Sequence, residues 1–263
     1  MKVFKTSDGI DLAYSDEGEG NPVIFIAGYR ASRHTWSMQT KLFVELGYRV
    51  LTLDRRSQGS SDRPNHGHRM SRHGKDLDDF MKALNLSNVL LIGQSMGAST
   101  IWAYVSLFGD NLLRGIVSID QTPKMLNETD WDYGMYHLNL TNLATFFDDP
   151  LPNPLYRSVD SKFLEDVAEK TKGDLPFDTT ETKPLLLDHA FSNWLDVLPN
   201  VNVPVLFIAG KNSPFWPCEH AVASAKLCRD GRAEIINECG HAVNWEQPEA
   251  CNDTLVHFIQ QLK

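Results

Sequence analysis

Residues 89–100 of this chain read VLLIGQSMGAST. The first four residues form a continuous apolar run, which is typical of a strand buried on both faces of a parallel sheet. Glycine, glutamine, serine, methionine and glycine follow, and small residues then lead into apolar positions at helical spacing. The stretch predicts a strand, a tight turn with Ser95 at its tip, and a helix.

The glycines around Ser95 fit this turn. A serine between a strand and a helix is held in a strained backbone conformation that lifts its hydroxyl clear of the sheet. The chain then passes very close on either side, and Gly93 and Gly97 occupy the two positions where a Cβ would clash. Gly-x-Ser-x-Gly also occurs by chance in loops, but the flanking strand and helix favour a nucleophilic serine.

The amino-acid composition is typical of a globular protein. It has 263 residues, of which 42% are hydrophobic and 22% are charged, enough for one large core and a small appended lid. The net charge of −9 argues against nucleic acid or an anionic membrane as partner. The first residues turn polar too early for a signal peptide, so we expect a cytoplasmic protein with a small-molecule substrate. Assembly into a homodimer is left open by the sequence.

The cysteines and histidines give no clear metal pattern. No C-x-x-C pair is present, which favours free buried thiols in a reducing compartment over metal ligation. His66, His68 and His73 fall in the polar segment 55–73, which we expect to be a loop with solvated histidines; a metal site there is the minor alternative. We therefore expect no metal and no cofactor. The four cysteines are Cys218, Cys228, Cys239 and Cys251.

Short apolar runs alternate with amphipathic stretches through most of the chain. This alternation predicts an α/β fold with a mostly parallel central sheet and helices on both faces. A hairpin with an Asp-Gly turn is expected within residues 1–14. The expected buried strands are residues 23–27, 50–53, 89–92, 115–119, 203–209 and 233–237.

The alternation breaks after Asp120. Residues 121–199 contain several prolines, many aromatic residues and short helical patches, with no convincing strand. We interpret this segment as an inserted helical cap. Residues 1–120 and 200–263 are then expected to form the core.

A nucleophilic serine needs a base to accept its proton, and the base needs an orienting acid. The best candidate for the base is His241, in the sequence ECGHA at residues 238–242. It follows the last predicted strand and precedes the last helix. A histidine there can reach over the carboxyl edge of the sheet, where ligands bind in open α/β folds.

Four motifs together resemble the α/β-hydrolase family, and within it the capped serine esterase-like group. The second of them matches the family's D-x-R-G-x-G-x-S loop with Ser57 in place of a glycine. The resemblance implies the α/β-hydrolase fold and hydrolysis of a small carboxylic ester through an acyl-enzyme. The motifs are AGY at residues 27–29, DRRSQGSS at 54–61, GQSMG at 93–97 and GHAVNWEQPE at 240–249.

The position of the orienting acid differs from the family pattern. Most relatives place an Asp in the loop after the strand at residues 203–209, but Ser213 occupies that position here. A serine cannot balance an imidazolium charge. Asp120 closes the preceding strand at the same sheet edge, and some relatives, such as haloalkane dehalogenases, use a carboxylate there. We assign Ser95, Asp120 and His241 as the catalytic residues; a helix-cap or turn role is the alternative for Asp120.

Two further acids are weaker candidates because nothing places them behind the histidine: Glu219 and Glu238. The resemblance also implies an oxyanion hole made by the backbone N–H groups of Tyr29 and Met96. Arg30 and Arg33 lie near this loop and are expected to be solvated rather than to meet an anionic substrate.

Aromatic residues in and near the cap favour an apolar pocket for a small acyl or aryl ester. The alternative is that they only pack the cap onto the core. The candidate substrate-binding residues are Trp131, Tyr136, Phe146, Phe215 and Trp216.

Other chemistries stay open on the same fold. These are lactonase, C–C hydrolase, perhydrolase or haloperoxidase-type and cofactor-free dioxygenase activity, and, in another class, a hydrolase-like receptor for a small signalling molecule. Haloalkane dehalogenase and epoxide hydrolase activity is disfavoured because those enzymes carry Asp where this chain has Ser95.

Overall fold

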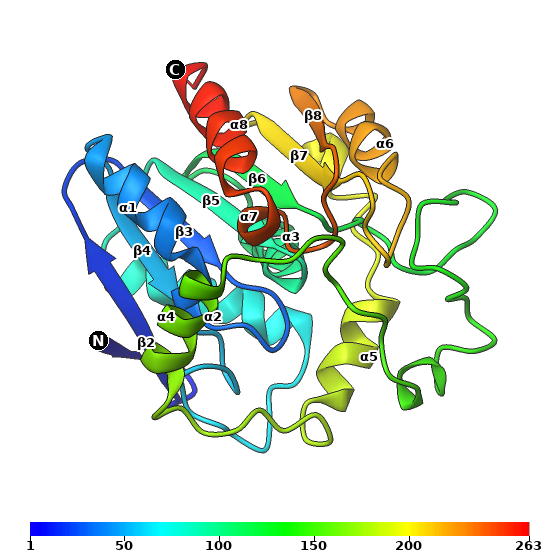
Figure 1. Ribbon diagram of the computed structural model, residues 1–263, viewed down its shortest axis with the longest axis horizontal. Coiled ribbons are helices and arrows are strands. Elements are labelled where there is room, and N and C mark those ends of the chain that lie inside the picture. Colours follow the sequence, from blue (N-terminus) through cyan, green and yellow to red (C-terminus); the bar gives the residue numbers. More distant parts are fainter. Residues whose placement is uncertain (263) are drawn as a thin grey trace.

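The computed structural model describes residues 1–262; Lys263, the last residue of the expected core, lies outside the described residues. Within residues 1–262, eight strands form one sheet in the order β1-β2-β4-β3-β5-β6-β7-β8 (Figure 1). The strands are β1 (Lys2–Lys5), β2 (Asp11–Glu17), β3 (Pro22–Ile26), β4 (Arg49–Leu53), β5 (Val89–Gln94), β6 (Leu113–Ile119), β7 (Val205–Gly210) and β8 (Gly231–Ile236).

The sheet has an antiparallel edge and a parallel body. β1 and β2 form the predicted hairpin, with Lys2 opposite Tyr14, and Gly9 takes a positive φ of 86° in the turn. β2 pairs antiparallel with β4, and every neighbouring pair from β4 to β8 is parallel. The expected α/β fold is therefore confirmed, and each predicted buried strand matches an observed one within a few residues at its ends.

Helices cover both faces of this sheet (Figure 1). Side chains alternate between the two faces along a strand, so Val23 and Phe25 of β3 pack with α1 and α8, whereas Ile24 and Ile26 pack with α2 and α3. The helices are α1 (Ser37–Glu45), α2 (Met70–Ala83), α3 (Met96–Phe108), α4 (Ser161–Thr171), α5 (Lys183–Phe191), α6 (His220–Leu227), α7 (Val243–Glu246) and α8 (Pro248–Gln260).

One expectation about the loop at residues 55–73 is wrong. Helix α2 already begins at Met70, and His73 lies inside it with only 1% of its surface exposed. The N–H of Met70 donates to the carboxylate of Asp188, 2.7 Å away, so the start of this helix is capped by a residue 118 positions later. Of the three histidines expected to be solvated, His66 is exposed and His68 is half-buried.

Residues 121–199 run between β6 and β7. They contain α4, α5, a short 3-10 helix (Phe146–Asp148) and two isolated β-bridges, and a second 3-10 helix (Leu198–Asn200) begins at their end. Leu185 of α5 packs with Met70 and Met96, which brings this segment against the end of α3 that carries Ser95. We call residues 121–199 the cap segment; their assignment as a separate cap domain stays a prediction. In the part of the chain that the structure describes, every helix is too short or too polar to cross a membrane.

Candidate active site

Ser95 lies at the turn between β5 and α3. Its backbone angles are φ 54° and ψ −132°, a positive-φ conformation that a non-glycine residue adopts only at a cost of ~1–3 kcal/mol. The N–H of Ser95 donates to Ile119 O, 2.9 Å away on β6, which helps to hold the turn. A Cβ at Gly93 would overlap the backbone of Ala98, and one at Gly97 would overlap the carbonyl of Ile26. Glycine is therefore required at both positions.

Asp120 and His241 are in direct contact. Oδ2 of Asp120 lies 2.7 Å from Nδ1 of His241, and the carboxylate has no exposed surface. Asp120 follows β6 with a positive φ of 45°. Its Oδ1 accepts the N–H of Gly210, 2.8 Å away at the end of β7. The carboxylate is thus held between the ends of two neighbouring strands and pointed at the histidine.

The environment keeps this carboxylate ionised. Burial alone would raise the pKa of Asp120, but the nearby histidines His220 and His241 lower it to about 2. The ionised carboxylate beside Nδ1 of His241 keeps the ring proton on Nδ1, which leaves the other ring nitrogen, Nε2, as the acceptor. The arrangement can therefore orient and charge-stabilise a general base.

The backbone holds His241 beside the serine turn. Nε2 of Gln94, the residue before Ser95, donates to the carbonyl of His241 at 3.1 Å, and the N–H of His241 donates to Pro154 O at 2.8 Å. Among residues 1–262, no hydrogen bond joins the Ser95 hydroxyl to the His241 ring. Such catalytic hydrogen bonds are often long without substrate and tighten when it binds.

The loop after β3 touches the same turn. A Cβ on Gly28 would lie only 2.9 Å from the Cβ of Ser95. The next residue is Tyr29, whose hydroxyl bonds Thr182 of the cap segment at 2.8 Å, and Met96 is the first residue of α3, where N–H groups lack helical acceptors. The two residues assigned to the oxyanion hole therefore follow Gly28 and Ser95, which lie against each other; their catalytic role stays a prediction.

Two of the five aromatic candidates contact the histidine. The rings of Phe215 and Trp216 meet His241 edge-on, with centroids 4.5 Å and 5.4 Å away. Phe146 packs against the apolar cluster that contains Phe215 and Trp216, but of the three only those two residues contact the histidine ring. Trp131 is buried elsewhere in the cap segment, with Nε1 donating to Thr122 Oγ1 at 3.0 Å.

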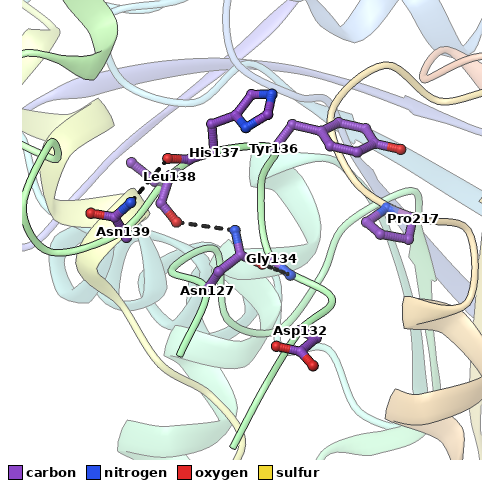
Figure 2. Close-up of a pocket in the computed structure, with 8 residues that line it drawn as sticks. All are labelled: Asn127, Asp132, Gly134, Tyr136, His137, Leu138, Asn139 and Pro217. Carbon is purple, nitrogen blue, oxygen red and sulfur yellow. Dashed lines mark hydrogen bonds between the residues drawn. The ribbon is translucent and has the colours of Figure 1, made fainter. Parts of the chain in front are cut away.

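Tyr136, the fifth aromatic candidate, is about half exposed at a pocket of about 270 Å³ in the cap segment (Figure 2). None of Ser95, Asp120 and His241 lines this pocket. Figure 2 shows the ring of Tyr136 on the same side as Pro217, which follows Trp216 in the chain. The lining residues are Asn127, Asp132, Gly134, Tyr136, His137, Leu138, Asn139 and Pro217.

Sequence reasoning missed the role of Glu246. Its buried carboxylate accepts the N–H groups of Gly240 (3.0 Å) and Ala242 (3.2 Å), on either side of His241. It also accepts those of Tyr156 (2.8 Å) and Arg157 (2.9 Å) in the cap segment. Glu246 therefore ties the histidine loop to the cap. The signal was present, since Glu246 belongs to the GHAVNWEQPE motif, but the motif does not say what the glutamate binds.

Other charged candidates have structural partners. Arg33, which was expected to be solvated, is 5% exposed and forms an ion pair with buried Asp54, so that expectation is wrong. Arg30 is exposed, and the carboxylate of Glu238 lies 3.5 Å from Arg157. The four cysteines carry free thiols. No group of three or more His, Cys, Asp and Glu side chains within residues 1–262 is arranged to hold a metal ion.

Comparison with known proteins identifies the family of this chain. The chain is 27% identical to a non-heme chloroperoxidase of Streptomyces lividans, over 99% of this chain and 100% of the relative. It is 26% identical, with the same coverage, to a bifunctional esterase/perhydrolase of Acinetobacter calcoaceticus. An esterase of Exiguobacterium antarcticum has the same fold, with a TM-score of 0.87 at 21% identity, over 98% of this chain and 99% of that one. The sequence profile of the alpha/beta hydrolase fold matches residues 21–248, and the chain belongs to this family.

Proposed function

We propose that this protein is a serine hydrolase that cleaves a small carboxylic ester through an acyl-enzyme. The observation that carries the proposal is the 2.7 Å contact between Asp120 and His241 beside the strained turn of Ser95. A serine, a histidine and a buried carboxylate are the parts that activate an alcohol at neutral pH.

The reaction then proceeds in two halves. His241 accepts the proton of the Ser95 hydroxyl as its oxygen attacks the ester carbonyl, and Asp120 stabilises the imidazolium that forms. The N–H groups of Tyr29 and Met96 stabilise the oxyanion, and loss of one such donor costs on the order of 10²–10³ in rate. His241 returns the proton to the leaving alcohol. It then activates a water that releases the acid from Ser95.

The aromatic residues around the base support a small apolar acyl or aryl group. Phe215, Trp216 and Phe146 belong to one apolar cluster, and two of them lie against the ring of His241. Rigid aromatic rings next to the reacting carbonyl exclude water and accept short hydrocarbon chains. The cytoplasmic location remains a prediction, and a homodimer remains an open alternative.

Hydrolysis of p-nitrophenyl acetate and butyrate tests the proposal. Ser95→Ala is expected to lower kcat/KM by at least about 10³-fold, because the nucleophile is lost. Ser99→Ala is the matched control, since Ser99 is a buried serine one turn along the same helix, and it should keep near wild-type rates. An equal loss in both variants, or rates unchanged in Ser95→Ala, would refute the assignment. A single burst with no turnover would favour the receptor alternative.

Perhydrolysis is a second candidate, favoured by the relatives named chloroperoxidase and esterase/perhydrolase. In this reaction hydrogen peroxide, rather than water, attacks the acyl group on Ser95. The acyl–oxygen bond to Ser95 breaks, a peracid leaves, and the serine hydroxyl is restored. Peracid formation from ethyl acetate and hydrogen peroxide should require both Ser95 and His241. Peracid formed at equal rates by wild type and Ser95→Ala would exclude this route.

A further inference from the structure

Three donors converge on the carboxylate of Asp120. The Ser213 hydroxyl donates to Oδ2 at 2.7 Å, which is the same oxygen that lies 2.7 Å from His241 Nδ1. The N–H of Gly210 donates to Oδ1 at 2.8 Å. Ser213 and Asp120 are both buried, so water does not compete strongly for these contacts. The serine that stands at the family's usual acid position is therefore bonded to the acid that replaces it.

The Ser213 hydroxyl is held by a rigid turn. The backbone N–H of Ser213 donates to the carbonyl of Gly210 at 3.2 Å. The N–H of Asn212 donates at 2.8 Å to the carbonyl of Cys239, which lies in the loop of His241. A Cβ on Gly210 would overlap the carbonyl oxygen of Gly240, so the two loops are in direct backbone contact. The hydroxyl is thus positioned before any substrate binds, and little side-chain entropy is lost in keeping it there.

We propose that Ser213 is a positioning residue that shares Oδ2 of Asp120 with His241 and thereby sets how strongly the carboxylate holds a proton on the histidine. A hydrogen bond to a charged group is worth roughly twice a neutral one. A donor on Oδ2 takes up part of the carboxylate's charge, and that part is no longer available to the imidazolium. Without the Ser213 hydroxyl, Asp120 stabilises protonated His241 more strongly.

Other titratable groups lie around Asp120 and His241. His220 approaches Asp120 from α6, and it lowers the pKa of the carboxylate together with His241. His189 lies on α5, where burial, followed by Arg55 and His241, lowers its pKa to about 3, so it stays neutral above that pH. The carboxylate of Glu246, on α7, is occupied by backbone N–H groups beside His241. Only Ser213 and His241 donate to Oδ2 among the hydrogen bonds of residues 1–262.

The inference rests on the proposed function for its kinetic readout, and a spectroscopic readout makes it independent. When kcat/KM for p-nitrophenyl acetate is measured against pH, activity falls in acid. In Ser213→Ala this fall should occur at a pH ~0.5–1 unit higher than in the wild type. Turnover at pH 8–9 should fall less than about tenfold. Ser213→Thr keeps the hydroxyl, so its activity should fall at the wild-type pH. If this variant fails to fold, Ser213→Cys, whose thiol is a weak donor, should lose activity at an intermediate pH.

The His241 ring resonance gives the second measurement. It is identified as the signal missing from His241→Gln, and its titration by NMR should move upward by the same ~0.5–1 unit in Ser213→Ala. Ser61→Ala, which removes a buried serine hydroxyl bonded to Asp54 instead, should leave the titration in place. An unchanged His241 titration in Ser213→Ala, or a change of equal size in Ser61→Ala, overturns the inference. Absence of ester hydrolysis with a shifted titration would refute the proposed function alone.

Discussion

The side chains of Asp120 and His241 lie 2.7 Å apart although 121 residues separate them in the sequence. The contact forms because β6, β7 and β8 are parallel neighbours and their carboxyl ends lie at the same edge of the sheet. Asp120, after β6, can therefore reach the loop of His241, which follows β8. The remaining charge on Asp120 is satisfied by Ser213 and Gly210, which leaves its orientation toward the histidine well determined.

Asp120→Asn should therefore lower kcat by about 10³–10⁴-fold on p-nitrophenyl esters. An amide cannot balance the imidazolium, and its NH₂ group favours the wrong tautomer of His241. Asp110→Asn is a suitable control, because Asp110 is also a buried aspartate, just after α3, and within residues 1–262 its carboxylate accepts only from Asn202. Equal activity in Asp120→Asn and wild type would show that another acid serves the histidine.

Glu246→Ala should destabilise the protein by about 3 kcal/mol or more. Removal of its carboxylate leaves the N–H groups of Gly240 and Ala242, and two more in the cap segment, without acceptors, and each unsatisfied buried group costs ~1–3 kcal/mol. Urea unfolding measures the loss. Glu249→Ala, at an exposed glutamate three positions on, should change stability by only a few tenths of a kcal/mol. Similar stabilities for the two variants would contradict this account of Glu246.

Gly210→Ala should lower both stability and activity. The new Cβ overlaps the carbonyl oxygen of Gly240, and since that atom is backbone, the loop of His241 has to move. Overpacking of this kind costs ~1–3 kcal/mol. Gly173→Ala is the control, because nothing lies within 4 Å of a Cβ at that position. Thermal melts and ester kinetics on both variants test the prediction, which fails if Gly210→Ala retains wild-type values.

His189→Gln should make the free energy of unfolding decrease less steeply as the pH is lowered. Burial, with Arg55 and His241, lowers the pKa of His189 to about 3 from the 6.5 expected in the unfolded chain. Between these pH values the unfolded state binds a proton that the native state excludes, so stability falls as the pH falls, by ~1.4 kcal/mol per pH unit. Unfolding free energies from pH 7 to 4.5 measure the slope. His66→Gln, at an exposed histidine, should keep the wild-type slope; a parallel slope in His189→Gln would contradict the assignment.

Much of the fold could be predicted because its signals are local. A buried strand followed by Gly93, Ser95 and Gly97 requires nothing distant to be recognised, and the positive φ of Ser95 follows from the same twelve residues. The start of α2 could not be predicted in this way. Its first N–H is capped by Asp188, so the chain at residues 70–73 appears polar and loop-like until the cap segment is in place.

The sequence by itself determined the order of strands and helices, the serine turn and the placement of His241 after the last strand, because these depend on the spacing of apolar residues and on glycines next to the serine. The sequence proposed Asp120 as the partner of His241, but only the tertiary structure decided that the two are in contact. Only the tertiary structure decided, too, that Ser213 bonds this acid and that Glu246 joins the histidine loop to residues 156 and 157. Each of these contacts joins residues from separate strand ends or loops. Their distances depend on how the strands align in the sheet, which no local pattern encodes.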